Sequence, residues 1–376
     1  MDTPVRVLTI LGTRPEAIKL APVLRALARQ RRRVESIVAV TGQHRQMLDQ
    51  VLTLFRIVPD VDLNLMKADQ GIGDFAAYAF AGVNTVLDQV RPDVVIVQGD
   101  TTTAAVAAQA AFYRRVPVAH VEAGLRTGDP ANPFPEEINR RLIDVLARYL
   151  FAPTLAAAEA LRREGHPRSS IHMTGNTVVD ALHAIVGRSP RRGPPPGPRH
   201  PLIVVTSHRR EHFGEPLRRI CLALIAVAKR RPDVRIVFPV HLNPNVRAVT
   251  TELLGRQDRI ELIEPMPYDA FIRLLAGASL AITDSGGIQE EAPALGVPVV
   301  IIRETTERME AVHAGAARLA GTSVRRIVST VLNELEPRRR RRVANVFGDG
   351  RAAERIVRVI LAEHAGTASK PRRKGR

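Results

Sequence analysis

Short apolar runs alternate with helical patterns along most of this chain. Each run of Val, Ile, Leu and Ala is followed by apolar residues at helical spacing, as in EAIKLAPVLRALARQ over residues 16–30. Continuous apolar runs between helices are typical of strands buried in parallel sheets. The pattern therefore predicts an α/β fold of doubly wound sheets. The predicted strands are 5–12, 34–42, 93–100, 116–124, 201–208, 234–241, 259–265, 280–287 and 297–304.

A single break interrupts this alternation. Residues 187–200, GRSPRRGPPPGPRH, are rich in Pro, Gly and Arg, which cannot build a helix interior or a central strand. The 376 residues suit two domains of common size. We therefore predict an N-terminal domain at 1–186, a linker at 187–200 and a C-terminal domain at 201–350, followed by a helix at 351–365 and a basic tail at 366–376.

Composition supports a globular protein with aliphatic cores. Hydrophobic residues make up 45% and charged residues 25%, while aromatic residues make up only 4%. The single cysteine, Cys221, excludes an internal disulfide and lies in an apolar helical pattern, which predicts a buried structural thiol. The N-terminal residues lack the layout of a signal peptide and no apolar run is long enough to span a bilayer. We expect a cytoplasmic protein.

The net charge of +17 is partly concentrated in basic tracts. Such tracts can bind nucleic acid or anionic lipid, but no recognised nucleic-acid motif accompanies them. We interpret them as solvated surface that also helps to attract an anionic substrate, and expect neither a nucleic-acid nor a membrane partner. The tracts are Arg29–Arg33, Arg191–Arg192, Arg338–Arg342 and Lys370–Arg376.

Reactive side chains gather just after the predicted strands. In open parallel sheets, ligands bind beyond the carboxyl ends of the strands, so these residues are candidates for a site in the cleft between two domains. Taken alone, Asp100 before a Thr run is equally well explained as a helix cap. The loop Ser285–Gly286–Gly287 can present backbone N–H groups to a phosphate, although such loops also serve as plain turns. The set comprises Arg14, Lys19, Asp100, His120, Glu122, His208, His241 and Asp284.

The motifs that contain these residues resemble those of the non-hydrolysing UDP-N-acetylglucosamine 2-epimerases. They include GTRPEAIKLAP, TGQHRQMLDQV, GDTTTAA, HVEAGLRTGD, NPFPEEINRR, TGNTVVDAL, SHRREHFGEP, PVHLNPNVR and TDSGGIQEEAPALGVPVV, from about Val5 to Asp349. The resemblance implies two Rossmann-like domains of the glycosyltransferase-B type, with the active site in the interdomain cleft and UDP on the C-terminal domain. It also implies a homodimer and a last helix that crosses back to the first domain. Three positions, Ser207, Met309 and Phe347, depart from the common family pattern, and none of them removes a charged catalytic group.

The same resemblance implies a reaction and residue roles. UDP-N-acetylglucosamine and UDP-N-acetylmannosamine would interconvert by elimination and re-addition of UDP through 2-acetamidoglucal, without cofactor or metal, supplying activated N-acetylmannosamine for cell-surface polysaccharide. The catalytic residues would be Asp100, Glu122, Glu136 and His208. Substrate would be bound by Arg14, Lys19, Phe271, Ser285, Gly286, Gly287, Glu291 and Arg308. A second, regulatory UDP-N-acetylglucosamine would be bound by Gln43, Gln46, Gln70, Arg210 and His241.

Other functions remain open at this point. A glycosyltransferase could use the same UDP-binding architecture, although three carboxylates around the sugar argue against it. An epimerase acting on a modified UDP-N-acetylhexosamine and a hydrolysing epimerase that releases free N-acetylmannosamine are further alternatives. A non-catalytic sugar-nucleotide sensor or a basic RNA-binding protein belongs to a different class. The sequence also leaves open which carboxylate removes the C2 proton.

Overall fold

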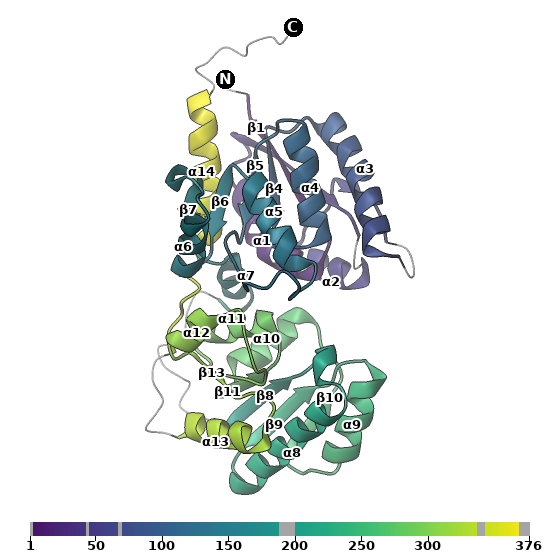
Figure 1. The fold of residues 1–376 in the computed structure, drawn as a ribbon, viewed down its shortest axis with the longest axis vertical. Coiled ribbons are helices and arrows are strands. Elements are labelled where there is room, and N and C mark those ends of the chain that lie inside the picture. Colours follow the sequence, from purple (N-terminus) through teal and green to yellow (C-terminus); the bar gives the residue numbers. More distant parts are fainter. Residues whose placement is uncertain (1–2, 43–44, 67–69, 188–199, 337–342, 368–376) are drawn as a thin grey trace. The chain divides into compact units, whose positions relative to one another are not determined.

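The computed structural model describes residues 3–42, 45–66, 70–187, 200–336 and 343–367. The chain divides into two compact units, Met1–Ala181 with Gly348–Arg376, and Leu182–Phe347 (Figure 1). Most of the predicted linker at 187–200, and the tail Lys370–Arg376, lie outside the described residues.

The first unit contains a parallel sheet in the order β3-β2-β1-β4-β5-β6-β7. The strand order reverses between β1 and β4, the position at which open α/β sheets bind their ligands. Because all strands run parallel, their carboxyl ends meet at one edge of the sheet. The strands are β1 (Val5–Leu11), β2 (Val34–Val40), β3 (Val61–Asp62), β4 (Val94–Gln98), β5 (Val118–Val121), β6 (Tyr149–Ala152) and β7 (Ile171–Met173).

Helices cover this sheet in two groups. Helix α3 packs against α4 and α4 against α5, whereas α1 packs against α2 and α14. The helices are α1 (Arg14–Ala28), α2 (Arg45–Phe55), α3 (Ile72–Val90), α4 (Thr102–Tyr113), α5 (Glu136–Leu146), α6 (Leu155–Arg163) and α14 (Ala352–Thr367). Helix α7 (Thr177–Val186) begins in this unit and continues past its boundary at Ala181.

The second unit repeats the same design. Its parallel sheet has the order β10-β9-β8-β11-β12-β13, with the reversal between β8 and β11. The prediction of two Rossmann-like, doubly wound sheets is confirmed. The strands are β8 (Leu202–Thr206), β9 (Arg235–Pro239), β10 (Ile260–Ile263), β11 (Leu280–Thr283), β12 (Val299–Ile301) and β13 (Ala317–Leu319). The helices are α8 (Glu215–Arg230), α9 (Pro244–Leu254), α10 (Tyr268–Ala276), α11 (Gly286–Ala294), α12 (Met309–His313) and α13 (Val324–Leu335).

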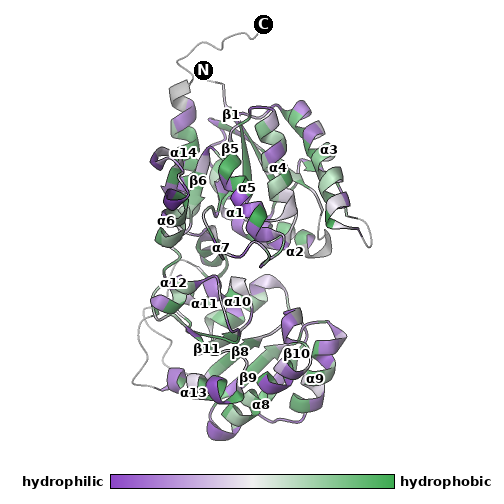
Figure 2. Ribbon diagram, in the orientation of Figure 1, coloured by the Kyte–Doolittle hydropathy of each residue, from purple (hydrophilic) through white to green (hydrophobic). Residues whose placement is uncertain are grey.

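Both cores are built mainly from aliphatic side chains. The strands are predominantly apolar, whereas the helices mix apolar and hydrophilic residues (Figure 2). Among the largest fully buried side chains are Leu8, Ile96 and Leu150 in the first unit and Phe238 in the second. Cys221 is fully buried in α8, and this burial raises the pKa of its thiol to about 12. The thiol therefore stays protonated and unreactive at neutral pH.

Helix α14 completes the first unit although it comes last in the sequence. The carboxylate of Asp180, in α7, accepts hydrogen bonds from the backbone N–H groups of Ala352 (3.2 Å) and Ala353 (3.0 Å). These are orphan donors at the start of α14, so Asp180 caps the helix. Arg355 adds a hydrogen bond of 2.9 Å to the carbonyl oxygen of Thr174.

One helical face of the first unit leaves large apolar side chains in contact with solvent. Val145 of α5 is 72% exposed and Tyr113 of α4 is 63% exposed. Ile138 and Leu142 are also exposed and lie at helical spacing from Val145. Clustered exposed apolar groups are typical of surfaces that associate. This face is our candidate surface for the predicted homodimer, which a molecular mass measured in solution would test.

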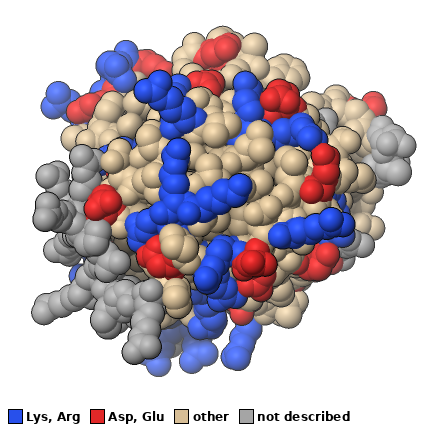
Figure 3. Space-filling view, turned by 90° about the horizontal axis from the view of Figure 1, so that it is seen from below, with Lys and Arg blue, Asp and Glu red and all other residues tan. Residues whose placement is uncertain are grey.

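Charged side chains are interleaved on the surface. Figure 3 shows one face on which many Lys and Arg side chains lie among Asp and Glu side chains. Several arginines form ion pairs near the surface, including exposed Arg218 with Glu252 (2.9 Å) and half-buried Arg231 with Asp233 (2.6 Å). Among the described residues, no helix has both the length and the apolar character needed to cross a membrane.

A matched pair of glycines tests the packing at the end of β5. Gly124 has φ +86°, and a Cβ there would lie 2.4 Å from the carbonyl oxygen of Ala157 in α6. Gly128 has φ +84° but open space around the same position. We expect Gly124→Ala to lower the free energy of unfolding by about 3 kcal/mol or more. Gly128→Ala should lower it by about 1 kcal/mol, from backbone strain alone.

The measurement is urea unfolding of the two variants and the parent protein, followed by circular dichroism. An equal decrease in the free energy of unfolding in the two variants would contradict the close approach of Gly124 to α6.

Candidate active site

The first cluster of predicted residues lies at the carboxyl ends of β4 and β5, which are neighbours in the sheet. Glu122 directly follows β5 and is 8% exposed. Its carboxylate binds the ammonium group of Lys19, from α1, and the side-chain amide of Gln98, from β4. Asn176 Nδ2 lies 3.5 Å from the same carboxylate. The predicted residues Lys19 and Glu122 are thus brought into direct contact.

The backbone at Glu122 is unusual as well. Its φ of +72° is a conformation that residues other than glycine rarely adopt. The backbone N–H groups of Glu122 and Ala123 both donate to the carbonyl oxygen of Phe151, at 3.1 Å. Such strained conformations persist only where surrounding bonds hold them, and they concentrate at functional sites.

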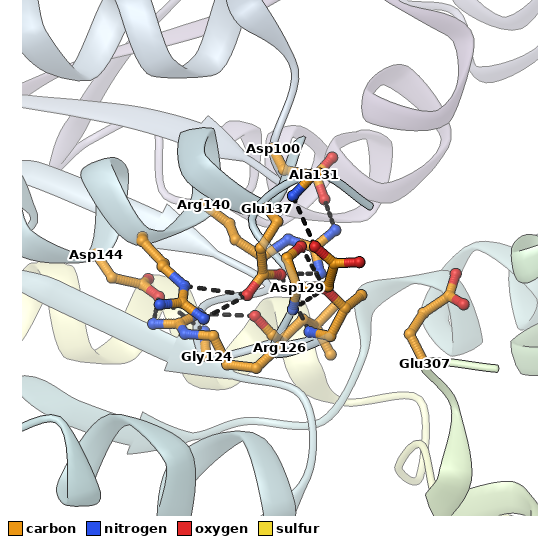
Figure 4. Close-up of polar contacts among 12 residues, drawn as sticks. Asp100, Gly124, Arg126, Asp129, Ala131, Glu137, Arg140, Asp144 and Glu307 are labelled. Atoms are coloured by element: carbon orange, nitrogen blue, oxygen red, sulfur yellow. Dashed lines mark hydrogen bonds and ion pairs between the residues drawn. The ribbon is translucent and has the colours of Figure 1, made fainter. Parts of the chain in front are cut away.

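Asp100 follows β4 and lies beside α5 (Figure 4). Arg140 Nη2 is 2.5 Å from its carboxylate, and Asn139 Nδ2 donates to its carbonyl oxygen at 2.9 Å. Arg140 is 4% exposed and also pairs with Glu137. Helix α5 therefore fixes both the backbone and the side chain of Asp100.

The other predicted residues of this unit are less tightly held. Glu136 is half-buried as the first residue of α5, where a carboxylate is also favoured by the helix dipole. Arg14 is exposed as the first residue of α1.

Glu16 is a buried carboxylate that sequence reasoning missed. Its Oε2 accepts hydrogen bonds from the backbone N–H groups of Gly12 (3.0 Å) and Thr13 (2.8 Å), and Thr101 Oγ1 lies 2.7 Å from Oε1. It therefore joins the loop after β1 to the loop after β4. Burial raises the pKa of Glu16 to about 7, although these hydrogen bonds act in the opposite direction. The capping-box spacing of Thr13 and Glu16 could have identified the residue as a helix cap.

A second buried group, of which the sequence identified only His120, contacts the strand ends that carry Asp100 and Glu122. Asp144 of α5 and His120 of β5 are both fully buried and in contact at 2.6 Å. Arg126 Nη2 binds Asp144 at 2.7 Å and Glu164 at 2.6 Å (Figure 4 shows the Asp144 contact). The sequence placed His120 at a strand end but gave no sign of its partner, because Asp144 lies in the middle of a helical pattern.

In the second unit, Asp284 organises the loop after β8. It is fully buried, and its carboxylate accepts hydrogen bonds from Ser207 Oγ (3.0 Å), His208 N (3.0 Å), Arg209 N (3.1 Å) and His212 Nδ1 (3.0 Å). Burial by itself would raise the pKa of this carboxyl, but the bonds from His208, His212 and Arg209 outweigh it and hold the pKa far below its ordinary value. Asp284 is therefore an anion that shapes the loop carrying the predicted catalytic His208.

The imidazole of His208 lies near a second predicted histidine. Its side chain is 44% exposed, and its ring centroid is 6.1 Å from that of His241. Burial, followed by the neighbouring His208, lowers the pKa of His241.

The predicted phosphate-binding loop has the geometry of a helix start. Ser285 is the N-cap of α11, which begins at Gly286 and Gly287. A Cβ at Gly286 would lie 3.3 Å from Oε1 of Glu307 and 3.4 Å from Cζ of Arg308, so this ion pair adjoins the start of the helix. Free N–H groups at a helix start beside a cation form a ready anion site.

The remaining predicted residues of this unit lie around α10 and α11. Glu291 accepts a hydrogen bond of 2.9 Å from the hydroxyl of Tyr268, a residue that sequence reasoning missed. Arg308 pairs with Glu290 at 2.9 Å. Phe271 is half-buried on α10.

The structure places part of the predicted regulatory set. Gln70 is half-buried shortly before α3, and His241 is exposed after β9. Gln43 and the side chains of Gln46 and Arg210 lie outside the described residues. Among the residues that are described, no group of three or more His, Cys, Asp or Glu side chains is placed to hold a metal ion.

The chain is similar to known proteins in both sequence and fold. The family model of UDP-N-acetylglucosamine 2-epimerase matches residues 25–361. The UDP-N-acetylglucosamine 2-epimerase of Salmonella typhimurium is 48% identical over 94% of this chain and 98% of its own length. The UDP-GlcNAc 2-epimerase of Neisseria meningitidis, solved bound to UDP-GlcNAc, is 42% identical with a TM-score of 0.86, covering 95% of this chain and 100% of its own. A structure from Listeria monocytogenes described as a UDP-N-acetylglucosamine 2-epimerase has a TM-score of 0.88 at 42% identity, over 97% and 98% of the two chains.

Glu16 generates a prediction on the pH dependence of stability. Its folded pKa of about 7 lies above its ordinary value of 4.5. Such a group stabilises the fold fully below pH 4.5, and this contribution is lost as the pH rises through 7. In Glu16→Gln, which keeps an acceptor and a donor but does not ionise, this loss, on the order of 3 kcal/mol, should be absent.

Urea unfolding of the variant and the parent protein between pH 4.5 and 7.5 measures the difference. The control is Glu35→Gln, which removes an exposed carboxylate paired with Arg6. Parallel pH curves for Glu16→Gln and the parent protein would contradict the raised pKa.

Proposed function

The chain belongs to the UDP-N-acetylglucosamine 2-epimerase family, and from this we infer that it inverts C2 of UDP-N-acetylglucosamine to give UDP-N-acetylmannosamine. We propose that the reaction proceeds by elimination of UDP to 2-acetamidoglucal and re-addition of UDP. The observation that carries this proposal is the paired strand ends of β4 and β5, which hold Asp100 and Glu122 in fixed orientations. Inversion at a carbon needs groups that exchange a proton on its two faces, and two oriented carboxylates can serve in that way.

The hydrogen at C2 is scarcely acidic because no carbonyl group lies next to C2 in the ring. Elimination avoids a free carbanion, since the C1–O bond to UDP breaks as the C2 proton leaves. Asp100, Glu122 and Glu136 are the candidates for this proton transfer. Glu122 already forms an ion pair with Lys19, and Asp100 forms one with Arg140. Both carboxylates are therefore held in place before substrate binds, which reduces the reorganisation that the reaction requires.

Departure of UDP places growing negative charge on its diphosphate. We propose that the N–H groups at the start of α11, at Gly286 and Gly287, stabilise this charge together with Arg308. His208 is a further candidate, because Asp284 fixes its backbone while its ring stays 44% exposed. Arg14 and Lys19 supply further positive charge, and Glu291 and Phe271 are the candidates for contacts with ribose and uracil. That these residues form one site in an interdomain cleft stays a prediction.

Incubation with UDP-N-acetylglucosamine in heavy water tests the reaction. We expect deuterium at C2 in an intact nucleotide sugar that equilibrates with UDP-N-acetylmannosamine. Asp100→Asn, Glu122→Gln and His208→Ala should each lower turnover by about 100-fold or more without unfolding the protein. Glu35→Gln, at an exposed carboxylate of β2, is the control that should retain full activity.

The other functions have distinct outcomes in the same experiment. Release of free N-acetylmannosamine would identify a hydrolysing enzyme, and transfer of the sugar to an added acceptor would identify a glycosyltransferase. Turnover close to that of the parent protein in two of the three variants would contradict the assigned roles.

We further propose that a second molecule of UDP-N-acetylglucosamine activates the enzyme through Gln43, Gln46, Gln70, Arg210 and His241. A ligand that favours a closed state for another ligand gives sigmoidal kinetics. UDP-N-acetylmannosamine alone should then react slowly, and a trace of UDP-N-acetylglucosamine should accelerate it. Initial rates in both directions, for the parent protein and for Gln43→Ala and His241→Ala, measure this effect. Hyperbolic kinetics without any need for priming would refute it.

A further inference from the structure

His120 makes two hydrogen bonds from the interior of the first sheet. The residue lies on β5 and is fully buried. Its Nδ1 is 2.6 Å from Oδ1 of Asp144, and its Nε2 is 2.7 Å from the carbonyl oxygen of Gly99. A carbonyl oxygen can only accept a hydrogen bond, so Nε2 must carry a proton. The charge on the ring then depends on whether Nδ1 carries one as well.

Whether Nδ1 carries a proton depends on the charge of Asp144, which its surroundings determine. Its Oδ2 accepts hydrogen bonds from the backbone N–H of Gly124 (3.2 Å) and from the guanidinium of Arg126 (2.7 Å). Burial by itself would raise the pKa of the Asp144 carboxyl, but His120 and Arg126 outweigh it and hold that pKa below its ordinary value. An ionised carboxylate can only accept, so Nδ1 must donate to it. Both nitrogens of the ring therefore face acceptors, the carboxylate of Asp144 and the carbonyl oxygen of Gly99.

The second bond of the ring reaches the backbone that carries Asp100. Gly99 has φ +71° and its carbonyl is the last one before Asp100. The carbonyl of Asp100 itself is held by Asn139, and its carboxylate by Arg140. The strand end is thus fixed at three successive points by side chains of β5 and α5.

The same pair of residues also holds the segment after Glu122. Asp144 binds the N–H of Gly124, two residues beyond Glu122, while His120 lies two residues before it. One buried ion pair therefore connects the two strand ends that carry Asp100 and Glu122. Asp144 is the charged side chain that contacts the ring, and Arg126 links it to Glu164. Arg140, on the same helix as Asp144, pairs with Asp100 and Glu137.

We propose that His120 is a positioning residue, an imidazolium buried against Asp144, which fixes the Gly99 carbonyl and so orients Asp100 and Glu122 for proton transfer at C2. The role rests on the proposed function. His120 does not touch substrate. It holds the segments after β4 and β5, so that the carboxylates of Asp100 and Glu122 keep their orientation while the substrate exchanges a proton. Misplacement of a reacting group by about 1 Å can lower the rate by about 100-fold.

The protonation state is tested first, on the unmodified protein. Selective ¹⁵N labelling of histidine, with assignment by His120→Gln, reports the protons on both ring nitrogens by NMR. We expect both His120 nitrogens to stay protonated at pH 7.5, where the enzyme is assayed. A signal from one bare ring nitrogen at that pH would overturn the proposal.

The kinetic test uses Asp144→Leu, which has a similar size but no oxygen. Nδ1 of the ring and the N–H of Gly124 then lose their acceptor, so neither strand end is held through residue 144. We expect kcat to fall by about 10-fold to 100-fold at pH 7.5, with KM changed by less than about threefold. An unchanged kcat, or a loss confined to KM, would contradict the proposed role.

His120→Gln supplies the direct variant, with His172→Gln on β7 as its control. His172 is a half-buried strand histidine of the same sheet, and its ring lies against Phe151. We expect kcat to fall in His120→Gln and to stay at the value of the parent protein in His172→Gln. If His120→Gln does not fold, the NMR signal and the kinetics of Asp144→Leu still decide the proposal.

Failure of the proposed function would look different from failure of this inference. If the unmodified protein incorporates no deuterium at C2, the epimerase proposal fails whatever the state of His120. If it does incorporate deuterium while His120 is neutral, only the positioning role is overturned.

Discussion

An ionised carboxylate is costly to bury unless donors surround it, and this constraint governs the strand ends of the protein. Glu122 is enclosed by Lys19 and Gln98, and Asp144 by His120, Arg126 and the N–H of Gly124. Each of these anions requires donors from several different elements. The donors can meet only if β4, β5 and the helices around them keep their relative positions. The need to satisfy buried charge therefore specifies the geometry on which the proposed chemistry depends.

The second unit meets the same constraint with different residues. Asp284 collects N–H groups from the loop after β8 and the ring of His212, much as Asp144 collects the N–H of Gly124 and the ring of His120. In both units an aspartate that the substrate need not touch shapes a loop that carries a proposed catalytic residue. Removal of one partner from such an arrangement leaves an uncompensated buried charge, which is why these networks tolerate little change.

The pattern of apolar runs was sufficient to predict the fold class and the longer strands. The run at 201–208 became β8 (Leu202–Thr206), and the run at 280–287 became β11 together with the start of α11. Strands β3, β6, β7 and β13 were not predicted, because their segments lack the longer apolar runs that mark equally short strands such as β5 and β12. Motifs placed most of the proposed site residues, since strand-end positions can be recognised along the sequence. Their partners could not be found in this way. Arg140 and Asp144 lie within an ordinary amphipathic helix, and only the fold shows which of its faces meets β5.

The first unit is discontinuous, and this has a consequence for biosynthesis. Its sheet ends before Ala181, but α14, which covers part of α1, comes from residues 352–367. A ribosome makes the chain from the N-terminus, so the whole second unit is translated while that face of α1 still lacks its cover. The carboxylate of Asp180 likewise has no hydrogen bonds from α14 until Ala352 and Ala353 have been synthesised. The C-terminal unit, whose residues are contiguous, can finish folding as it is made, whereas the N-terminal unit reaches its final form only after residues 352–367 have been synthesised.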